Sequence, residues 1–223
     1  MTAPTSARRP AGRARLTRET IVDRYIELAD RAAGAEIPLR QLGEALGVDP
    51  TAVYRHFRAK DDLLAAVTDR LLTAAVDGFE PTGDWREDLR ALGMRTRTVY
   101  LSHPHLARVL AQSPSSHPGN ARLIEACLSA LRSSGLSDSD AARAVELMED
   151  YVAGVSSLDA EIDESAVAAW RRELAALPAE RYPHLAAVSG HLHGSGPGSF
   201  EFGLDLLLDG LAARARRCGR SSP

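Results

Sequence analysis

The chain has 223 residues, of which 44% are hydrophobic and 26% are charged, and its formal net charge is −3. This length accommodates one large or two small domains with a real apolar core, which excludes wholesale disorder, and the acidic balance excludes a protein that coats nucleic acid over its whole surface. No apolar run approaches the roughly 18 residues that span a bilayer, and two cysteines without CxxC spacing exclude a disulfide framework and favour a reducing cytoplasm.

A basic arm precedes the first predicted helix. Residues 1–16 are rich in Ala, Pro, Gly and Arg, a composition typical of disorder. Thr17 is a good N-cap and Gly34 a good helix end, and apolar residues recur at helical spacing between them. We therefore expect a disordered arm over residues 1–16 and a helix over residues 18–33.

Two short helices joined by a tight turn are predicted next. The first covers residues 39–46 and buries its leucines. Gly47 supplies the left-handed backbone conformation that the turn requires. Asp49 caps the second helix, in which Pro50 occupies the first position, where its missing N–H costs nothing.

The second short helix divides its residues between the core and solvent. Val53 and Phe57, four residues apart, face the core. The polar and cationic residues left outside are Thr51, Tyr54, Arg55 and His56. A helix-turn-helix uses this arrangement to place its second helix in the DNA major groove, so the pattern predicts DNA binding.

The remaining residues read as a helical body, so the expected fold class is all-α. Turn residues predict a loop over residues 113–120 and a long, mobile loop over residues 178–199 with one short helix near Leu185. The expected division is a helix-turn-helix domain over residues 17–62 and a regulatory, ligand-binding and dimerisation domain over residues 63–217. The helices expected in the body cover residues 60–76, 85–101, 105–111, 121–133, 138–161, 166–177 and 200–217.

Charge is distributed unevenly along the chain. Residues 1–60 hold 11 Lys and Arg against 7 Asp and Glu, whereas residues 61–223 hold 16 against 23. A basic first third on an acidic body suits a small nucleic-acid-binding domain attached to a regulatory one. Chance is the open alternative, because a balance of +4 over 60 residues is modest.

Several motifs carry a resemblance to a known family. The aromatic–basic run YRHF, with Lys60 three residues beyond it, follows an LGV turn and precedes a KxxLL helix start. Over residues 17–64 this pattern resembles the DNA-binding domain of the tetracycline-repressor (TetR) family. The segments LSHPHLARVL, LSALRSSGLSDSDAARAVELMEDYVAG and FEFGLDLLLDGL also follow the order of a tetracycline-repressor-like C-terminal domain.

This resemblance implies DNA-contacting roles, to which the side-chain chemistry is suited. Arginine can bond guanine bidentately, and a lysine ammonium can hold a phosphate; Lys60 is the only lysine of the chain. Arg55 stands where the tetracycline repressor has Trp, and Ala52 where many relatives have Thr or Ser, so base preference should differ and one polar contact is missing. The implied DNA-binding residues are Arg40, Thr51, Ala52, Tyr54, Arg55, His56 and Lys60.

Two further sets of residues are predicted in the body. Leu110 falls where the tetracycline repressor has a metal-ligating His, so the resemblance does not extend to a metal–tetracycline ligand. Aromatic or polar residues on otherwise inward faces are candidates to line an effector pocket. These candidates are Trp85, Leu89, Tyr100, His103, Leu110 and Tyr151.

The last helix is apolar over most of its girth and calls for burial on two sides. With the helix over residues 138–161 it can form a four-helix bundle across a two-fold axis; burial within one subunit is the alternative. The predicted dimer interface comprises Leu147, Tyr151, Phe202, Leu206, Asp209 and Gly210.

The expected protein is thus a homodimeric repressor, released from a palindromic operator by a small-molecule effector, with no cofactor, no metal, no catalytic residues and no membrane association. HExxH, GxGxxG, P-loop and GxSxG motifs are absent from the sequence. Two alternatives stay open: an α-helical enzyme, and a DNA-binding or scaffold protein without small-molecule control.

Overall fold

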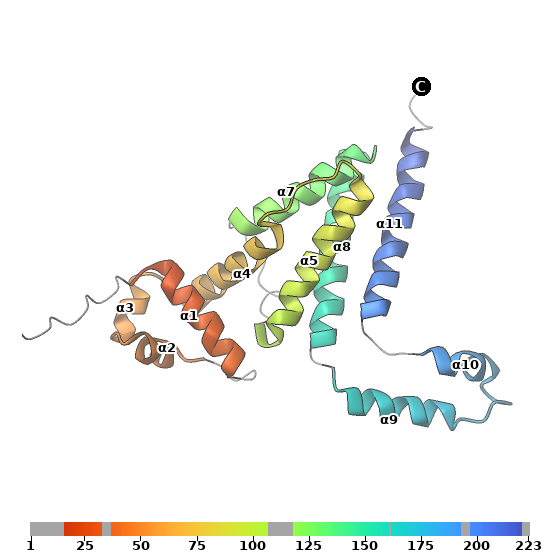
Figure 1. Ribbon diagram of the computed structural model, residues 1–223, viewed down its shortest axis with the longest axis horizontal. Coiled ribbons are helices and arrows are strands. Elements are labelled where there is room, and N and C mark those ends of the chain that lie inside the picture. Colours follow the sequence, from red (N-terminus) through yellow and green to blue (C-terminus); the bar gives the residue numbers. More distant parts are fainter. Residues whose placement is uncertain (1–15, 33–36, 107–117, 161, 193–196, 220–223) are drawn as a thin grey trace, which may run out of the picture.

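The structure, a computed structural model, describes residues 16–32, 37–106, 118–160, 162–192 and 197–219 (Figure 1). Within these ranges all regular structure is helical, which confirms the predicted all-α class. In chain order the elements are α1 (Arg18–Arg31), α2 (Leu39–Leu46), α3 (Pro50–Tyr54), α4 (Lys60–Val76), α5 (Trp85–Ser102), α7 (Pro118–Ser133), α8 (Asp138–Ala160), α9 (Glu164–Ala175), α10 (Pro183–Val188), the 3-10 turn η1 (Ser189–His191) and α11 (Pro197–Gly219).

The first three helices form a lobe at one end of the molecule (Figure 1). Thr17 caps α1 through a reciprocal hydrogen-bonded box with Thr20, which confirms the predicted start. One apolar core joins these helices to the first half of α4, so the lobe is closed by a helix that continues into the body. Its large, almost fully buried side chains include Ile21, Ile37, Leu42, Val53, Phe57, Leu63 and Val67.

The body is a stack of helices beyond this lobe (Figure 1). Helix α5 packs against α4, α7 and α8, and α11 covers α8 and α5 from the other side. A buried ion pair joins these layers: an Arg97 Nη lies 2.5 Å from an Asp159 carboxylate oxygen, and the Arg97 guanidinium also lies 4.4 Å above the Phe200 ring. This pair links α5, α8 and α11 in the interior.

Helices α9 and α10 extend from the body as a separate arm (Figure 1). Neither helix buries a residue, and the arm leaves Trp170 and Val188 largely exposed. The short helix predicted near Leu185 is present as α10. No helix in the described ranges is long and apolar enough to cross a membrane.

The structure corrects several predicted boundaries. Helices α7 and α11 each begin three residues earlier than expected, at Pro118 and Pro197, because proline is well suited to the first position of a helix. The segment 113–120 is therefore partly helical. Residues 104–106 are helical, but the rest of the helix predicted over 105–111 lies outside the described residues, as does most of the arm over 1–16.

Candidate DNA-binding surface and effector cavity

The turn between α2 and α3 has the geometry that its residues predict. Gly47 adopts φ 66°, and Asp49 accepts a hydrogen bond from the Thr51 backbone N–H at 2.8 Å. A side chain at Gly43 would place its Cβ 3.0 Å from Pro50 Cα, a tight contact that would push the two helices slightly apart. The angle between α2 and α3 is thus set by close backbone contact.

The end of α3 is held in place from α1. An Arg18 Nη donates to the backbone oxygen of His56 at 2.6 Å, and the Arg18 guanidinium lies 4.1 Å above the ring of Phe57. Phe57 itself is buried. Helix α3 ends at Tyr54, and Arg55 and His56 lie in the turn that follows it, not on the helix as predicted.

The candidate DNA-contacting residues occupy the outer surface of this unit to different degrees. Thr51, Tyr54 and Arg55 are exposed, whereas His56 and Lys60 are half-buried, as is Ala52. Within the part of the chain that the structure describes, Arg55 forms no ion pair. Thr51, Tyr54 and Arg55 therefore have side chains presented to a partner.

Two of the exposed candidates, Arg40 and Thr51, already have intramolecular partners. Arg40 on α2 is exposed and lies 3.4 Å from Glu44, a pair that water weakens. The Thr51 hydroxyl donates to Asp49 at 2.6 Å. That bond, followed by the Thr51 backbone N–H, lowers the pKa of the Asp49 carboxyl, so the N-cap is charged at neutral pH.

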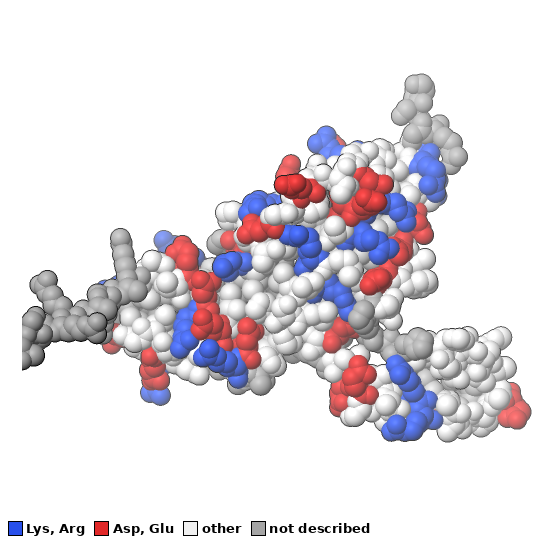
Figure 2. All heavy atoms as spheres, viewed as in Figure 1, with Lys and Arg blue, Asp and Glu red and all other residues white. Residues whose placement is uncertain are grey.

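Charge on the broad face of the molecule is mixed (Figure 2). Acidic and basic side chains alternate over the lobe and the upper body in this view, so this face forms no continuous basic surface.

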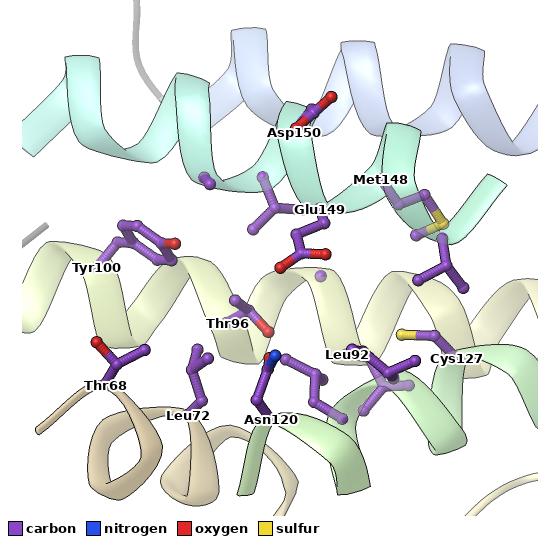
Figure 3. Close-up of a pocket in the computed structure, with 16 residues that line it drawn as sticks. Thr68, Leu72, Leu92, Thr96, Tyr100, Asn120, Cys127, Met148, Glu149 and Asp150 are labelled. Atoms are coloured by element: carbon purple, nitrogen blue, oxygen red, sulfur yellow. The ribbon is translucent and has the colours of Figure 1, made fainter. Parts of the chain in front are cut away.

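A cavity of about 350 Å³ lies in the body between α4, α5, α7 and α8. Its size is that of a small-molecule site. Most of the lining is aliphatic, and a few polar groups converge on the space (Figure 3). The lining residues are Thr68, Leu72, Leu92, Gly93, Thr96, Tyr100, Asn120, Leu123, Ile124, Cys127, Val145, Met148, Glu149, Asp150, Val152 and Ala153.

The polar groups of the cavity influence one another. Burial, and secondarily the carboxylate of Glu149, raises the pKa of the Tyr100 hydroxyl and of the Cys127 thiol to about 12 each. Burial also raises the pKa of Glu149, and the neighbouring carboxylates of Asp150 and Glu146 add to that effect. Tyr100 and Cys127 are thus neutral hydrogen-bonding groups at physiological pH.

Only part of the predicted effector set borders this cavity. Tyr100 lines it, and Leu110 lies outside the described residues. Leu89 is fully buried in the core between α5, α8 and α11, and Trp85 packs against that same core. His103 lies at the end of α5, where its Nδ1 is 3.0 Å from an Asp30 carboxylate oxygen of α1.

The sequence prediction missed most of the cavity's polar residues. Thr68 and Thr96 each interrupt an apolar helix face, and Glu149 stands between the cavity-lining Met148 and Val152. A polar residue on an inward face was the available signal. Asn120 was missed because it was assigned to a loop, whereas it lies in the first turn of α7.

The predicted dimer residues separate into an exposed group and one inward residue. Leu147 on α8 and Phe202 and Leu206 on α11 expose 50%, 67% and 55% of their surface, and Asp209 and Gly210 are also exposed. Tyr151 instead turns inward, and its hydroxyl donates to the backbone oxygen of Phe200 at 2.8 Å. Helix α11 is therefore buried on one side by its own chain and apolar on the other, not enclosed within the subunit.

Within the described ranges, no group of three or more His, Cys, Asp or Glu side chains could hold a metal ion. The cavity and the α2–α3 unit are the two features that a function must use.

Family models match both parts of the chain. The model described as "Tetracyclin repressor-like, C-terminal domain" matches residues 78–215, and the model described as "Bacterial regulatory proteins, tetR family" matches residues 31–67. The chain belongs to the TetR family. It is therefore a DNA-binding transcriptional regulator, as the resemblance of its motifs implied.

Individual relatives are similar to this protein over most of its length. The HTH-type transcriptional repressor Rv1353c of Mycobacterium tuberculosis is 33% identical over 86% of this chain and 78% of its own length. The Streptomyces coelicolor TetR family protein ActR, solved in complex with actinorhodin, is 26% identical, with a TM-score of 0.83 over 91% of this chain and 99% of its own. BioQ, solved with its double-stranded DNA operator, is 27% identical, with a TM-score of 0.63 over 89% of this chain and 99% of its own.

Proposed function

We propose that the chain is a homodimeric repressor that a small molecule, bound in the α4–α5–α7–α8 cavity, releases from an inverted-repeat operator. The single observation that carries this proposal is the double role of α4. Thr68 and Leu72 line the cavity, while Leu63 and Val67 of the same helix are buried in the core of the DNA-binding lobe. A ligand that displaces α4 therefore displaces the lobe as well.

Other contacts make this coupling stiff. The backbone N–H of Gly119 on α7 donates to Asp69 of α4 at 2.6 Å, and Arg95 Nε of α5 donates to the backbone oxygen of Ala75 at 2.5 Å. On the lobe side, Arg70 Nε of α4 lies 3.1 Å from Asp23 of α1. A ligand needs differential affinity for the two arrangements, typically about 1–3 kcal/mol of coupling.

The exposed apolar surface supports a dimer. Helices α8 and α11 lie side by side, and each exposes large apolar side chains. In a monomer these side chains, Leu147, Leu158, Phe202 and Leu206, would remain in contact with water. Gly210 has open space around the position of a Cβ, so a second helix can approach closely there. Two copies packed on this surface would form a four-helix bundle and present two α3 units to successive major grooves, about 34–36 Å or a multiple apart.

The relatives support the remaining parts of the proposal. Rv1353c is named a repressor, the BioQ structure contains an operator, and the ActR structure contains a small molecule. We propose that this chain likewise represses transcription, binds an operator and binds a small molecule. We also propose that it catalyses no reaction and acts in the cytoplasm, where bacterial chromosomal DNA is found. Control by a small molecule distinguishes this proposal from a constitutive DNA-binding protein.

A binding experiment on the DNA that flanks the protein's own gene tests the proposal. We expect fluorescence anisotropy to detect a salt-sensitive complex of two copies per site and footprinting to show an inverted repeat. Candidate effectors are then titrated into the complex, and at least one should lower operator affinity and raise the melting temperature of the free protein. A monomer that ignores every flanking fragment would contradict the proposal.

A further inference from the structure

The cavity has an unusual charge balance. None of the described residues that line it is Lys, Arg or His, whereas Glu149 and Asp150 are acidic. In Figure 3 the Glu149 carboxylate points from α8 into the cavity, toward Thr96 and Asn120, and Asp150 points away from it. One carboxylate therefore sets the electrostatic potential inside, which repels anions and attracts cations.

Glu149 is exposed to solvent over part of its side chain, and its carboxylate points into the cavity without a partner in the described chain. No described residue forms a hydrogen bond or ion pair with its carboxylate. Its field extends over the space, since it contributes to the raised pKa values of both Tyr100 and Cys127. A bound cation would supply the missing partner and favour the charged form of the carboxyl.

Thr68 supplies an independent sign of a ligand on the opposite wall. Its side chain is 1% exposed, and its hydroxyl has no hydrogen-bond partner among the described residues. Figure 3 shows this hydroxyl rising from α4 on the side of Tyr100, at the edge of the cavity. A buried hydroxyl without a partner is costly and uncommon in folded proteins, so a polar group of a ligand fits here.

We propose that the cavity takes a small molecule with an apolar, ring-sized body and a protonated amine, and that Glu149 is the counter-ion of this amine. The body lies against Leu72, Leu92 and Met148, and a second polar group of the natural ligand meets Thr68. Such a molecule spans α8 and α4. This inference rests on the proposed function, because it names the chemical class of the effector.

Three indole probes differ mainly in the charge at the end of a short side chain. Tryptamine is a cation at neutral pH, tryptophol is neutral and indoleacetate is an anion, while all three share the apolar ring. Calorimetric titration of the full chain should show tryptamine binding about tenfold more tightly than tryptophol, a difference of about 1.4 kcal/mol, since a hydrogen bond between two charged groups is stronger than one from a neutral hydroxyl. Indoleacetate should bind most weakly of the three.

Matched variants assign the preference to one carboxylate. Glu149→Gln keeps the shape of the side chain and should bring tryptamine and tryptophol to equal affinity. Glu146→Gln removes a neighbouring carboxylate of α8 that does not line the cavity, and it should keep the preference. Thr68→Val should leave the melting temperature of the free protein unchanged or raise it, because it removes a buried hydroxyl without a partner.

The outcomes separate this inference from the proposed function. Equal affinity for the three probes, no tryptamine binding at millimolar concentration, preference for indoleacetate, or a preference that survives Glu149→Gln would overturn the amine ligand. A lower melting temperature of Thr68→Val would show that the hydroxyl already has a partner in the free protein, and it would overturn the proposed contact between Thr68 and the ligand. Operator binding, measured in parallel without any probe, tests the proposed function on its own.

Discussion

The DNA-binding lobe and the helical body are both built from amphipathic helices, but they differ in how closely these helices pack. In the lobe, Leu42 and Val53 are fully buried in the apolar core that α1, α2 and α3 share. In the body, α4, α5, α7 and α8 leave a space of about 350 Å³ and α11 leaves an apolar face in water. The lobe is built to keep one shape, and the body is built to receive other molecules.

This contrast explains how a rigid surface can be regulated. A closely packed core changes shape little, so we expect the spacing of residues on α3 to be preserved when a ligand binds in the body. A core with a cavity has an alternative arrangement in which a ligand fills the space. Since α4 belongs to both regions, the change in the body becomes a displacement of an unchanged lobe.

The largest expected effect concerns packing in the closed core. Leu42→Ala should lower the free energy of unfolding by about 2–5 kcal/mol, because it leaves a void that the lobe cannot fill. Leu72→Ala should cost less than Leu42→Ala, since Leu72 already borders the cavity. Urea unfolding of both variants measures the difference. An equal decrease in the free energy of unfolding would contradict the proposed difference in packing between the two regions.

The next effect tests the exposed face of the body. A Phe202→Asp, Leu206→Asp double variant should be monomeric and bind the operator at least about 100-fold more weakly, because the second half-site is no longer tethered. Light scattering after gel filtration and anisotropy measure the two properties. Leu101→Asp, at an exposed leucine of α5, is the control and should remain a dimer.

On the lobe, Arg55→Ala tests base reading. We expect a loss of operator binding of about 1–3 kcal/mol and a relaxed preference at one base pair, since a guanidinium bonds guanine bidentately. Arg31→Ala, at the far end of α1, removes the same charge and should keep that preference. Affinities for operator variants with single-base changes test whether Arg55 recognises a base pair. An unchanged base preference in Arg55→Ala would mean that another side chain recognises that base.

A smaller effect is expected at the start of α4. Lys60→Ala should weaken binding alike on all DNA sequences and flatten the dependence of log affinity on log salt by about one unit, because one fewer phosphate is neutralised. Lys60→Arg keeps the charge and should keep the slope. A slope that does not change in Lys60→Ala contradicts the phosphate contact.

The smallest effect is a pH dependence at the cap of α3. Hydrogen bonds from Thr51 lower the pKa of Asp49 in the folded state, so the carboxylate stabilises the fold above its ordinary pKa and this contribution is lost as the pH falls through the lowered value. Melting temperatures of the wild-type chain and Asp49→Ala should therefore converge in acid. A gap that is constant from neutral pH to pH values below the ordinary pKa would argue against a charged cap.

Local signals made the lobe predictable from sequence. Thr17, Gly47, Asp49 and Pro50 each act on the backbone within a few residues, and the structure places them as N-cap, left-handed turn, N-cap and first helical residue. Pro118 and Pro197 begin α7 and α11 in the same way, so a start at residues 121 and 200, which apolar spacing predicts, is three residues late.

The cavity depends on contacts that sequence periodicity does not contain. Thr68, Asn120 and Glu149 come from α4, α7 and α8, and their convergence follows from how these helices pack around α5. Periodicity distinguishes an inward face from an outward one, but it does not say whether an inward residue borders a packed core or an empty space. Leu89 and Tyr100 were both predicted to line a pocket, and only Tyr100 does.

The two faces of α4 have a practical consequence for engineering sensors. Thr68 and Leu72 border the effector cavity, whereas Leu63 and Val67, on the same seventeen-residue helix, support the lobe. A combinatorial library restricted to the first pair, together with Glu149, would alter which chemical signal is detected. Recognition of the operator would be unchanged, so a single reporter strain could screen every member of such a library.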